Sequence, residues 1–379
     1  MERDNLSEKM EQTEQGTSRP SDTLSRLSHF SVPASRHRSI FVSPYPWCFA
    51  LLLGALVLSA AIGAVTIPSL DVIRILLSRL PCIHITPDWP ATSETILFDI
   101  RLPRTILMAL TGAALSGSGA AYQGLFRNPL ADPYLIGIAS GAGLGAISAM
   151  ALQSSATGLG LALVPAAAFV GALLTVVVVY SLARVGKTTP VTTLILAGVA
   201  VGSFTTALTT FLMLRSQGEL RRAVAWILGG FSLSGWEPVV AALPYIGLGL
   251  IVLLALSWQL NVLQFGEDQA RQLGLNVERV KLVLIGAASL AAAAAVAFSG
   301  SIGFVGLAVP HVVRLLWGSD YRRLLPLSII GGAAALLLAD VAARTVIAPQ
   351  ELPVGIVTAL VGAPFFLWLL RRAKQQALW

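Results

Sequence analysis

From residue 47 onward the chain is a succession of long apolar runs, and this pattern constrains the fold more than any single motif. A helix needs about 20 apolar residues to cross a bilayer, and about 17–25 are tolerated. Hydrophobic residues make up 55% of the chain and charged residues 12%, so too few polar side chains remain to cover a soluble globule. We therefore expect an all-α polytopic membrane protein. Its ten transmembrane helices are predicted over 47–66, 97–124, 134–151, 161–183, 191–214, 237–257, 281–299, 302–317, 324–346 and 353–370.

An even number of spans places both termini on the same side of the membrane, and Lys and Arg indicate which side. Basic residues concentrate in cytoplasmic loops. If the termini are cytoplasmic, the inner basic set includes Arg127, Arg184, Lys187 and Lys281, and it is larger than the outer set. It stays larger when the basic residues of the N-terminal stretch are left out. Both termini are therefore predicted to be cytoplasmic.

The ends of the chain differ from its apolar middle. Residues 1–46 are rich in Ser, Thr, Glu and Arg and poor in aliphatic side chains, which predicts a disordered cytoplasmic tail. Because the first apolar run begins only at Trp47, behind a long mixed-charge stretch, no signal peptide is expected. The predicted organisation is a tail over 1–46, a ten-helix transmembrane domain over 47–372 and a short cytoplasmic tail over 373–379.

Small residues recur every four positions within the second predicted span. Gly112, Ser116, Ala120 and Gly124 form one such stripe, and the glycines at 137, 141 and 145 form another. Lipid tails are as apolar as leucine, so helices associate in a membrane by close packing, which small side chains permit. The stripes predict a compact helix bundle rather than a binding site.

The sequence contains only weak motifs for nucleotide binding, metal binding or proton transfer. The stretch SLARVGKT (181–188) nearly matches a nucleotide-binding P-loop, but it closes an apolar span and is followed by Pro190 instead of opening a helix after a strand. The cysteines and histidines show no metal-ligand spacing, so no metal site is expected. Asp340 is the clearest acidic residue inside a span. One carboxylate is thin support for a proton relay, so we expect Asp340 to pair with a nearby donor in a structural role.

The charged segment 263–281 separates two predicted spans, with Glu267 and Arg271 at the favourable i, i+4 spacing. Gly274 is expected to break it into two short helices. The segment is longer than a connection between antiparallel helices requires. From composition alone, a surface for a partner protein and a solvated connector are equally supported. The apolar stretch 219–230 is too short to cross and is expected to be re-entrant or interfacial.

Taken together, these stretches resemble the FecCD-type permeases of ABC importers for iron chelates and cobalamin. The resemblance covers most of the chain from about residue 100 and lies in the stretches 101–146, 194–202, 221–236, 270–276, 300–344 and 351–372. It implies a type II ABC importer permease architecture and a dimer, most simply a homodimer. It also implies two cytoplasmic ATPase subunits that bind ATP and Mg, and an extracytoplasmic binding protein. The chain itself then needs no cofactor, is not an enzyme, binds no nucleic acid and lies among lipids of a bacterial or archaeal cytoplasmic membrane.

The resemblance also implies roles for particular residues. ATPase coupling is expected from Gly266, Glu267, Ala270, Arg271, Gln272, Leu273, Gly274 and Leu275. Docking of the binding protein is expected from Arg101, Arg104 and Arg344, which would face acidic residues on that partner. Without the resemblance, each arginine reads as a side chain snorkelling to lipid headgroups. The translocation path is expected to include Gly202, Thr205, Thr206 and Thr209.

The cargo expected from the resemblance is an iron chelate, with a ferric siderophore first and haem or cobalamin as alternatives. The main rival is a secondary transporter driven by an ion gradient. That class requires intramembrane carboxylates and broken-helix ion sites, and only Asp340 offers one.

Overall fold

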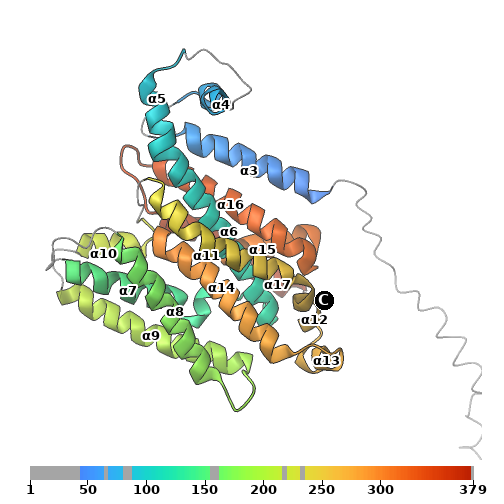
Figure 1. Cartoon of the computed structure of the whole chain (residues 1–379). Helices are drawn as coiled ribbons and strands as arrows, with labels where there is room; N and C mark the ends of the chain where they lie inside the picture. Colours follow the sequence, from blue (N-terminus) through green and yellow to red (C-terminus); the bar gives the residue numbers. More distant parts are fainter. Residues whose placement is uncertain are drawn as a thin grey trace, which may run out of the picture. The chain divides into compact units, whose positions relative to one another are not determined.

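The computed structural model describes residues 43–63, 67–79, 88–153, 162–215, 220–230 and 235–376. The predicted disordered tail therefore lies outside the described residues except for 43–46. Each predicted span coincides with a helix (Figure 1). These helices are α3 (Pro44–Ala61), α6 (Leu102–Phe126), α7 (Ile138–Gln153), α8 (Leu163–Ala183), α9 (Val191–Arg215), α11 (Glu237–Ala255), α14 (Val277–Ser299), α15 (Val305–Trp317), α16 (Tyr321–Thr345) and α17 (Val354–Gln376). The last helix continues through most of the predicted C-terminal tail, because nothing in its sequence stops a helix there.

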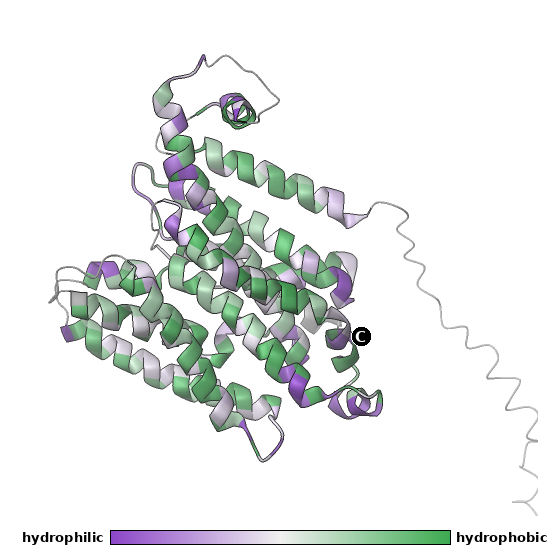
Figure 2. Ribbon diagram, viewed as in Figure 1, coloured by the Kyte–Doolittle hydropathy of each residue, from purple (hydrophilic) through white to green (hydrophobic). Residues whose placement is uncertain are grey.

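Shorter elements connect these helices. They are α4 (Ser69–Ser78), α5 (Ala91–Thr95), the π-helical turn η1 (Ile96–Arg101), the 3-10 turn η2 (Pro133–Ile136), α10 (Leu220–Ile227), α12 (Ser257–Leu263) and α13 (Glu267–Gln272). Figure 2 shows apolar residues along the long helices, with hydrophilic residues gathered at α5, α10 and α13. As expected, α10 is too short to cross a bilayer, since eight residues span about 12 Å.

Among the described residues, six helices are both long and apolar enough to cross a membrane: α3, α8, α9, α11, α14 and α16. Three shorter apolar helices lie within α7, α15 and α17. The long helix α6 lacks this hydropathy because it is rich in glycine and serine. Every residue from Thr111 to Phe126 in α6 is buried, so this helix packs against protein and needs no lipid-compatible surface.

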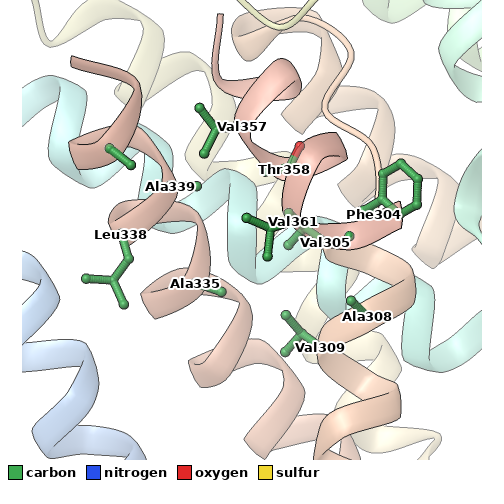
Figure 3. Close-up of a pocket in the computed structure, with 12 residues that line it drawn as sticks. Phe304, Val305, Ala308, Val309, Ala335, Leu338, Ala339, Val357, Thr358 and Val361 are labelled. Atoms are coloured by element: carbon green, nitrogen blue, oxygen red, sulfur yellow. The ribbon is translucent and has the colours of Figure 1, made fainter. Parts of the chain in front are cut away.

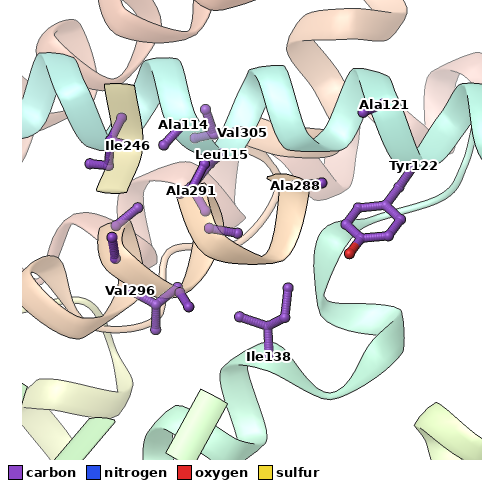
Figure 4. Close-up of a cluster of buried hydrophobic side chains, with 14 of the residues drawn as sticks. Ala114, Leu115, Ala121, Tyr122, Ile138, Ile246, Ala288, Ala291, Val296 and Val305 are labelled. Carbon is purple, nitrogen blue, oxygen red and sulfur yellow. The ribbon is translucent and has the colours of Figure 1, made fainter. Parts of the chain in front are cut away.

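The centre of the bundle is α6, which packs against α14, α15 and α16. Figure 4 shows Leu115 and Tyr122 of α6 among side chains from α14, α7, α11 and α15. A β-carbon on Gly112 would overlap the backbone carbonyl of Gly332 in α16, and one on Gly119 would overlap that of Gly306 in α15. The prediction that the small-residue stripe serves close packing is confirmed.

The second stripe packs α7 against α8. A β-carbon on Gly141 would meet Thr175, and one on Gly145 would overlap the carbonyl of Ala167. The hydroxyl of Thr175 donates to the carbonyl of Gly171 within α8, so no polar group is left open at this contact. This stripe, like the first, holds helices together.

Non-helical backbone enters the bundle between α14 and α15. Phe304 adopts a left-handed φ of 69° and packs against Gly362, well inside α17. The hydroxyl of Tyr134 donates to the carbonyl of Ile302 at 2.8 Å and accepts from the Ile302 N–H at 3.2 Å. The Gly355 N–H donates to Leu228. Such partners are required because unpaired backbone groups are costly inside a bilayer.

The two ends of the bundle can be identified by what contacts each end of α6. In its last turn, the Gly124 carbonyl accepts a hydrogen bond from Gln264, between α12 and α13, at 2.9 Å. In its first turn, Arg104 pairs with Asp340 of α16. We call these ends the α13 end and the Asp340 end. A 25-residue helix separates them by about 37 Å.

Candidate functional site

A cavity of about 780 Å³ lies between α7, η2, α9 and α10. None of the described residues that line it carries a charged side chain. Hydroxyl-bearing side chains line it from three parts of the chain, namely Tyr134, Ser140, Ser203, Thr206, Thr209, Thr210 and Ser301. The indole of Trp226 and the backbone of several small residues complete the wall. The size suits a bulky ligand, since drug-sized pockets run from about 300 to 1,000 Å³.

Three of the four predicted path residues line this cavity. Gly202, Thr206 and Thr209 contribute to the wall, whereas Thr205 points into the protein and donates its hydroxyl to the carbonyls of Val201 and Gly202. Thr205 lies on the same helix face as Thr209, one turn away, but it is not part of the wall. Whether this wall is a translocation path stays a prediction.

Two hydroxyl groups of the cavity wall donate hydrogen bonds within α9 itself. Thr209 donates to the carbonyl of Thr205 at 2.8 Å, and Thr210 donates to that of Thr206 at 3.0 Å. These two hydroxyls therefore have no proton left to donate to a ligand.

The predicted coupling segment forms a helix–turn–helix at the α13 end. Gly266 and Gly274 have positive φ values of 107° and 83°, so the chain turns before and after α13. The predicted break at Gly274 is confirmed, but the helix after it is the long α14 and not the second short helix that was expected. Glu267 and Arg271 form the expected ion pair, at 3.3 Å. Figure 1 shows α12 and α13 together near the end of α14.

The coupling residues divide between a buried and an exposed face. Ala270 is fully buried, while Leu273 is 65% exposed at the end of α13. Phe265, just before α13, is 67% exposed. Gln272 and Gly274 are also exposed, and Gly266, Glu267 and Leu275 lie at the boundary. Two large exposed apolar side chains that flank a charged helix favour a partner surface over a solvated connector.

One residue near this segment was missed by sequence reasoning, which counted Lys281 only as an inner positive charge. Its side chain is 3% exposed, and its ammonium lies 2.6 Å from Glu267. The signal that could have indicated the pairing with Glu267 is the position of a lysine one turn into a helix that follows an acidic segment, but nothing in the sequence places Thr189 beside it. Lys281 donates to the Thr189 carbonyl at 3.0 Å.

The arginines predicted to dock a binding protein gather at the Asp340 end. Arg104 lies 2.9 Å from Asp340 and 2.8 Å from Glu351. Arg344 also lies 2.9 Å from Asp340, whose side chain is fully buried. The expectation that Asp340 pairs with a donor is confirmed, and it holds two.

Two of these arginines correct the expectation that their guanidinium groups face outward. Arg101 is 6% exposed and donates to the carbonyls of Ala60 and Ala61. Arg344 is 8% exposed and donates to those of Ser59 and Ile62. Both bind the C-terminal carbonyls of α3, where cations are favoured by the helix dipole. Only Arg104 keeps partial exposure, 19% of its side chain. A docking role for any of the three stays a prediction.

A second, apolar pocket of about 310 Å³ lies between α15, α16 and α17 (Figure 3). Phe304, Val357 and Leu338 are among its lining residues, and Thr358 is the one hydroxyl-bearing residue there. The Thr358 hydroxyl donates to the carbonyl of Gly355, so the pocket offers a ligand little beyond apolar contact.

Asp132, between α6 and η2, gives a pH-dependent prediction. Burial raises the pKa of its carboxyl to about 6, although the carboxylate accepts a hydrogen bond from the Tyr134 N–H at 2.8 Å. An unfolded Asp has a pKa of about 3.9, so between the two values the folded chain keeps a proton that the unfolded chain has released. Stability therefore falls as the pH rises from about 4 to about 6.

We expect Asp132→Asn, which keeps an oxygen acceptor for Tyr134, to remove this fall. The measurement is the Tm of the detergent-solubilised protein against pH. Wild-type and variant curves that run parallel from pH 4 to pH 6 would contradict the assignment.

The comparisons with known proteins all find transport proteins. The sequence profile of the FecCD transport family matches residues 51–372. A cobalamin import system permease of Halobacterium salinarum is 49% identical over 289 residues, which are 76% of this chain and 77% of that protein. A hemin transport system permease of Yersinia pestis is 43% identical over 74% of this chain and 84% of its own. A solved metal-chelate type ABC transporter, in an inward-facing conformation, superposes with a TM-score of 0.75 at 31% identity. It covers 87% of this chain and all of its own.

Proposed function

The chain belongs to the FecCD transport family, and from that premise we propose that it carries a bulky metal chelate across a cytoplasmic membrane by alternating access. It is a membrane-spanning permease and not an enzyme, since ATP is hydrolysed by a separate subunit in transporters of this kind. The observation that carries the proposal is the uncharged, hydroxyl-lined cavity of about 780 Å³ beside α9. The ferric siderophore expected from the sequence is one candidate cargo. Cobalamin is the second, because the 49% identical relative is a cobalamin permease.

The assembly proposed is two copies of this chain, two ATPase subunits and one binding protein. The ATPase subunits dock at the α13 end, which is supported by the exposed Leu273 and Phe265 beside a charged helix. The binding protein docks at the Asp340 end, where Glu351 is half exposed beside Arg104. This orientation places both termini in the cytoplasm, as the distribution of basic residues predicts.

The secondary-transporter alternative loses its support. Asp340 is the carboxylate on which it depended, and Arg104 and Arg344 neutralise it. A proton or sodium site needs a carboxylate that can exchange its partner. Asp340 instead holds α6 to α16.

Uptake distinguishes the cargoes. Cells with and without the gene are given radiolabelled ferric ferrichrome, haemin or cyanocobalamin, together with the matching binding protein. We expect accumulation of one chelate only when the gene is present, and its loss when the ATPase carries a Walker-A lysine substitution. Uptake that continues without ATP hydrolysis, or that collapses with the ion gradient alone, would contradict the proposal.

The docking surface for the ATPase gives a second prediction. Leu273→Asp places a carboxylate at the exposed end of α13, and we expect the ATPase to bind about tenfold or more weakly, because buried apolar anchors dominate interfaces. Co-purification from detergent measures it. Arg323→Asp, an equally exposed change on α16, serves as the control. Equal recovery of the ATPase with both variants would place the surface elsewhere.

A further inference from the structure

We propose that Lys281 is a positioning residue that ties α13 to the connection leading into α9, so that displacement of α13 moves the cavity wall. The inference rests on the proposed function, because it assigns a transmission route between the ATPase-facing segment and the cargo path. Its basis is an ion cluster around the buried Lys281 that joins α13, α14 and the connection before α9.

The ammonium of Lys281 is the centre of this cluster. Nζ lies 2.6 Å from Glu267 Oε1, on the first residue of α13, and 3.5 Å from Glu278 Oε1, within α14. It also donates to the carbonyl oxygen of Thr189 at 3.0 Å. A lysine ammonium has three donors, and here each has an acceptor. One side chain thus contacts α13, α14 and the connection that leads into α9.

A second connection runs beside the first. The Thr189 N–H donates to Glu278 Oε2 at 3.1 Å, so both backbone groups of Thr189 are held by the charged side chains of α14. Arg271 of α13 lies 3.6 Å from Glu278 Oε1. Thr189 is followed by Pro190, whose ring fixes φ, and α9 begins at the next residue. The joint between the cluster and α9 is therefore short and stiff.

Burial decides which helix moves when α13 is displaced. Of the apolar window of α14, 72% is buried inside the chain, against 17% for α9. A helix packed by its own chain on most sides cannot shift without breaking those contacts, whereas α9 has few such contacts to break. Force applied at the cluster is therefore transmitted to α9. That helix carries Gly202, Thr206 and Thr209 of the cavity wall.

The test replaces Lys281 with methionine, which keeps the buried volume and removes the charge. Glu267 and Glu278 keep Arg271 as a partner, so no buried carboxylate is left unpaired. Arg279→Met, an exposed residue on the same helix outside the cluster, is the matched control. Lys281→Arg restores the charge. Each variant is purified as the full complex in proteoliposomes. ATP hydrolysis and uptake of radiolabelled cyanocobalamin and ferric ferrichrome are then measured.

We expect Lys281→Met to keep its ATP hydrolysis while transport per ATP falls about tenfold, as an allosteric coupling predicts. Arg279→Met should match the wild type, and Lys281→Arg should recover most of the loss. If Lys281→Met fails to assemble, Glu278→Met breaks the parallel connection at a 26% exposed side chain and is expected to show the same uncoupling.

Unchanged transport per ATP in the assembled variants overturns the inference. So does an equal loss of hydrolysis and transport in variants that still assemble, because that result indicates a structural role only. A wild-type complex that neither hydrolyses ATP nor takes up either probe contradicts the proposed function itself. A working wild type beside an unaffected Lys281→Met complex refutes only the role of Lys281.

Discussion

Asp340→Ala is expected to lower the free energy of unfolding by about 3–5 kcal/mol, because removing one partner of a buried ion pair leaves uncompensated charge behind. Asp340 is fully buried and lies 2.9 Å from both Arg104 and Arg344. In the variant, Arg344 keeps only uncharged hydrogen-bond acceptors among the described residues, namely carbonyl oxygens and the Ser59 hydroxyl. The guanidinium groups of Arg104 and Arg344 then repel each other without a carboxylate between them.

Thermal unfolding of the detergent-solubilised protein measures this effect. Glu351→Gln removes the other carboxylate that contacts Arg104, but that side chain is half exposed, so we expect less than about 1 kcal/mol. The comparison isolates burial, since both variants remove an acidic partner of the same arginine. Equal Tm values for the two variants would mean that Asp340 contributes no more than a surface ion pair.

Gly119→Ala is the second large effect, with an expected loss of about 3 kcal/mol or more. The added β-carbon would overlap the Gly306 carbonyl, and a backbone atom at the start of α15 cannot rotate away as a side chain can. Helices α6 and α15 must then separate, and Gln123 loses its hydrogen bond to the Leu307 carbonyl.

The matched control is Gly247→Ala in α11, where an added β-carbon meets no atom within 4 Å. Alanine favours a helix over glycine by about 1 kcal/mol, so this variant is expected to be neutral or slightly stabilised. Both variants are compared by Tm and by the fraction recovered as a single species on size exclusion. A Gly119→Ala protein as stable as the control would show that the α6–α15 contact relaxes freely.

Much of the architecture follows from local chemistry and was predictable. Apolar runs of spanning length fix where the helices lie, and four-residue spacing of small side chains fixes which faces meet, as Gly112 and Gly141 illustrate. The chain turn at Gly274 was also predictable from the sequence, because a glycine in a charged helical segment readily adopts the positive φ that ends a helix.

The remaining features depend on where distant residues meet. The sequence places Arg101 and Arg344 at the ends of spans. It does not show that both guanidinium groups reach the last turn of α3, which lies 41 residues from Arg101 and 285 residues from Arg344 along the chain. Lys281 looked like a surface charge for the same reason, since Thr189 and Glu267 meet it only in the folded chain. The entry of residues 300–304 into the bundle also needed Tyr134 as a partner from another segment.

The unequal burial of the cavity walls has a consequence for energy conversion. The wall formed by α7 is interlocked with α8 through Gly141 and Gly145, whereas α9 presents Leu196, Phe204 and Leu214 to its surroundings. In the proposed transporter, a tilt of α9 would therefore break few contacts within its own chain. The stiffness of this wall would then be set by what covers α9 in the assembled complex, lipid or the second copy, and not by the chain's own core.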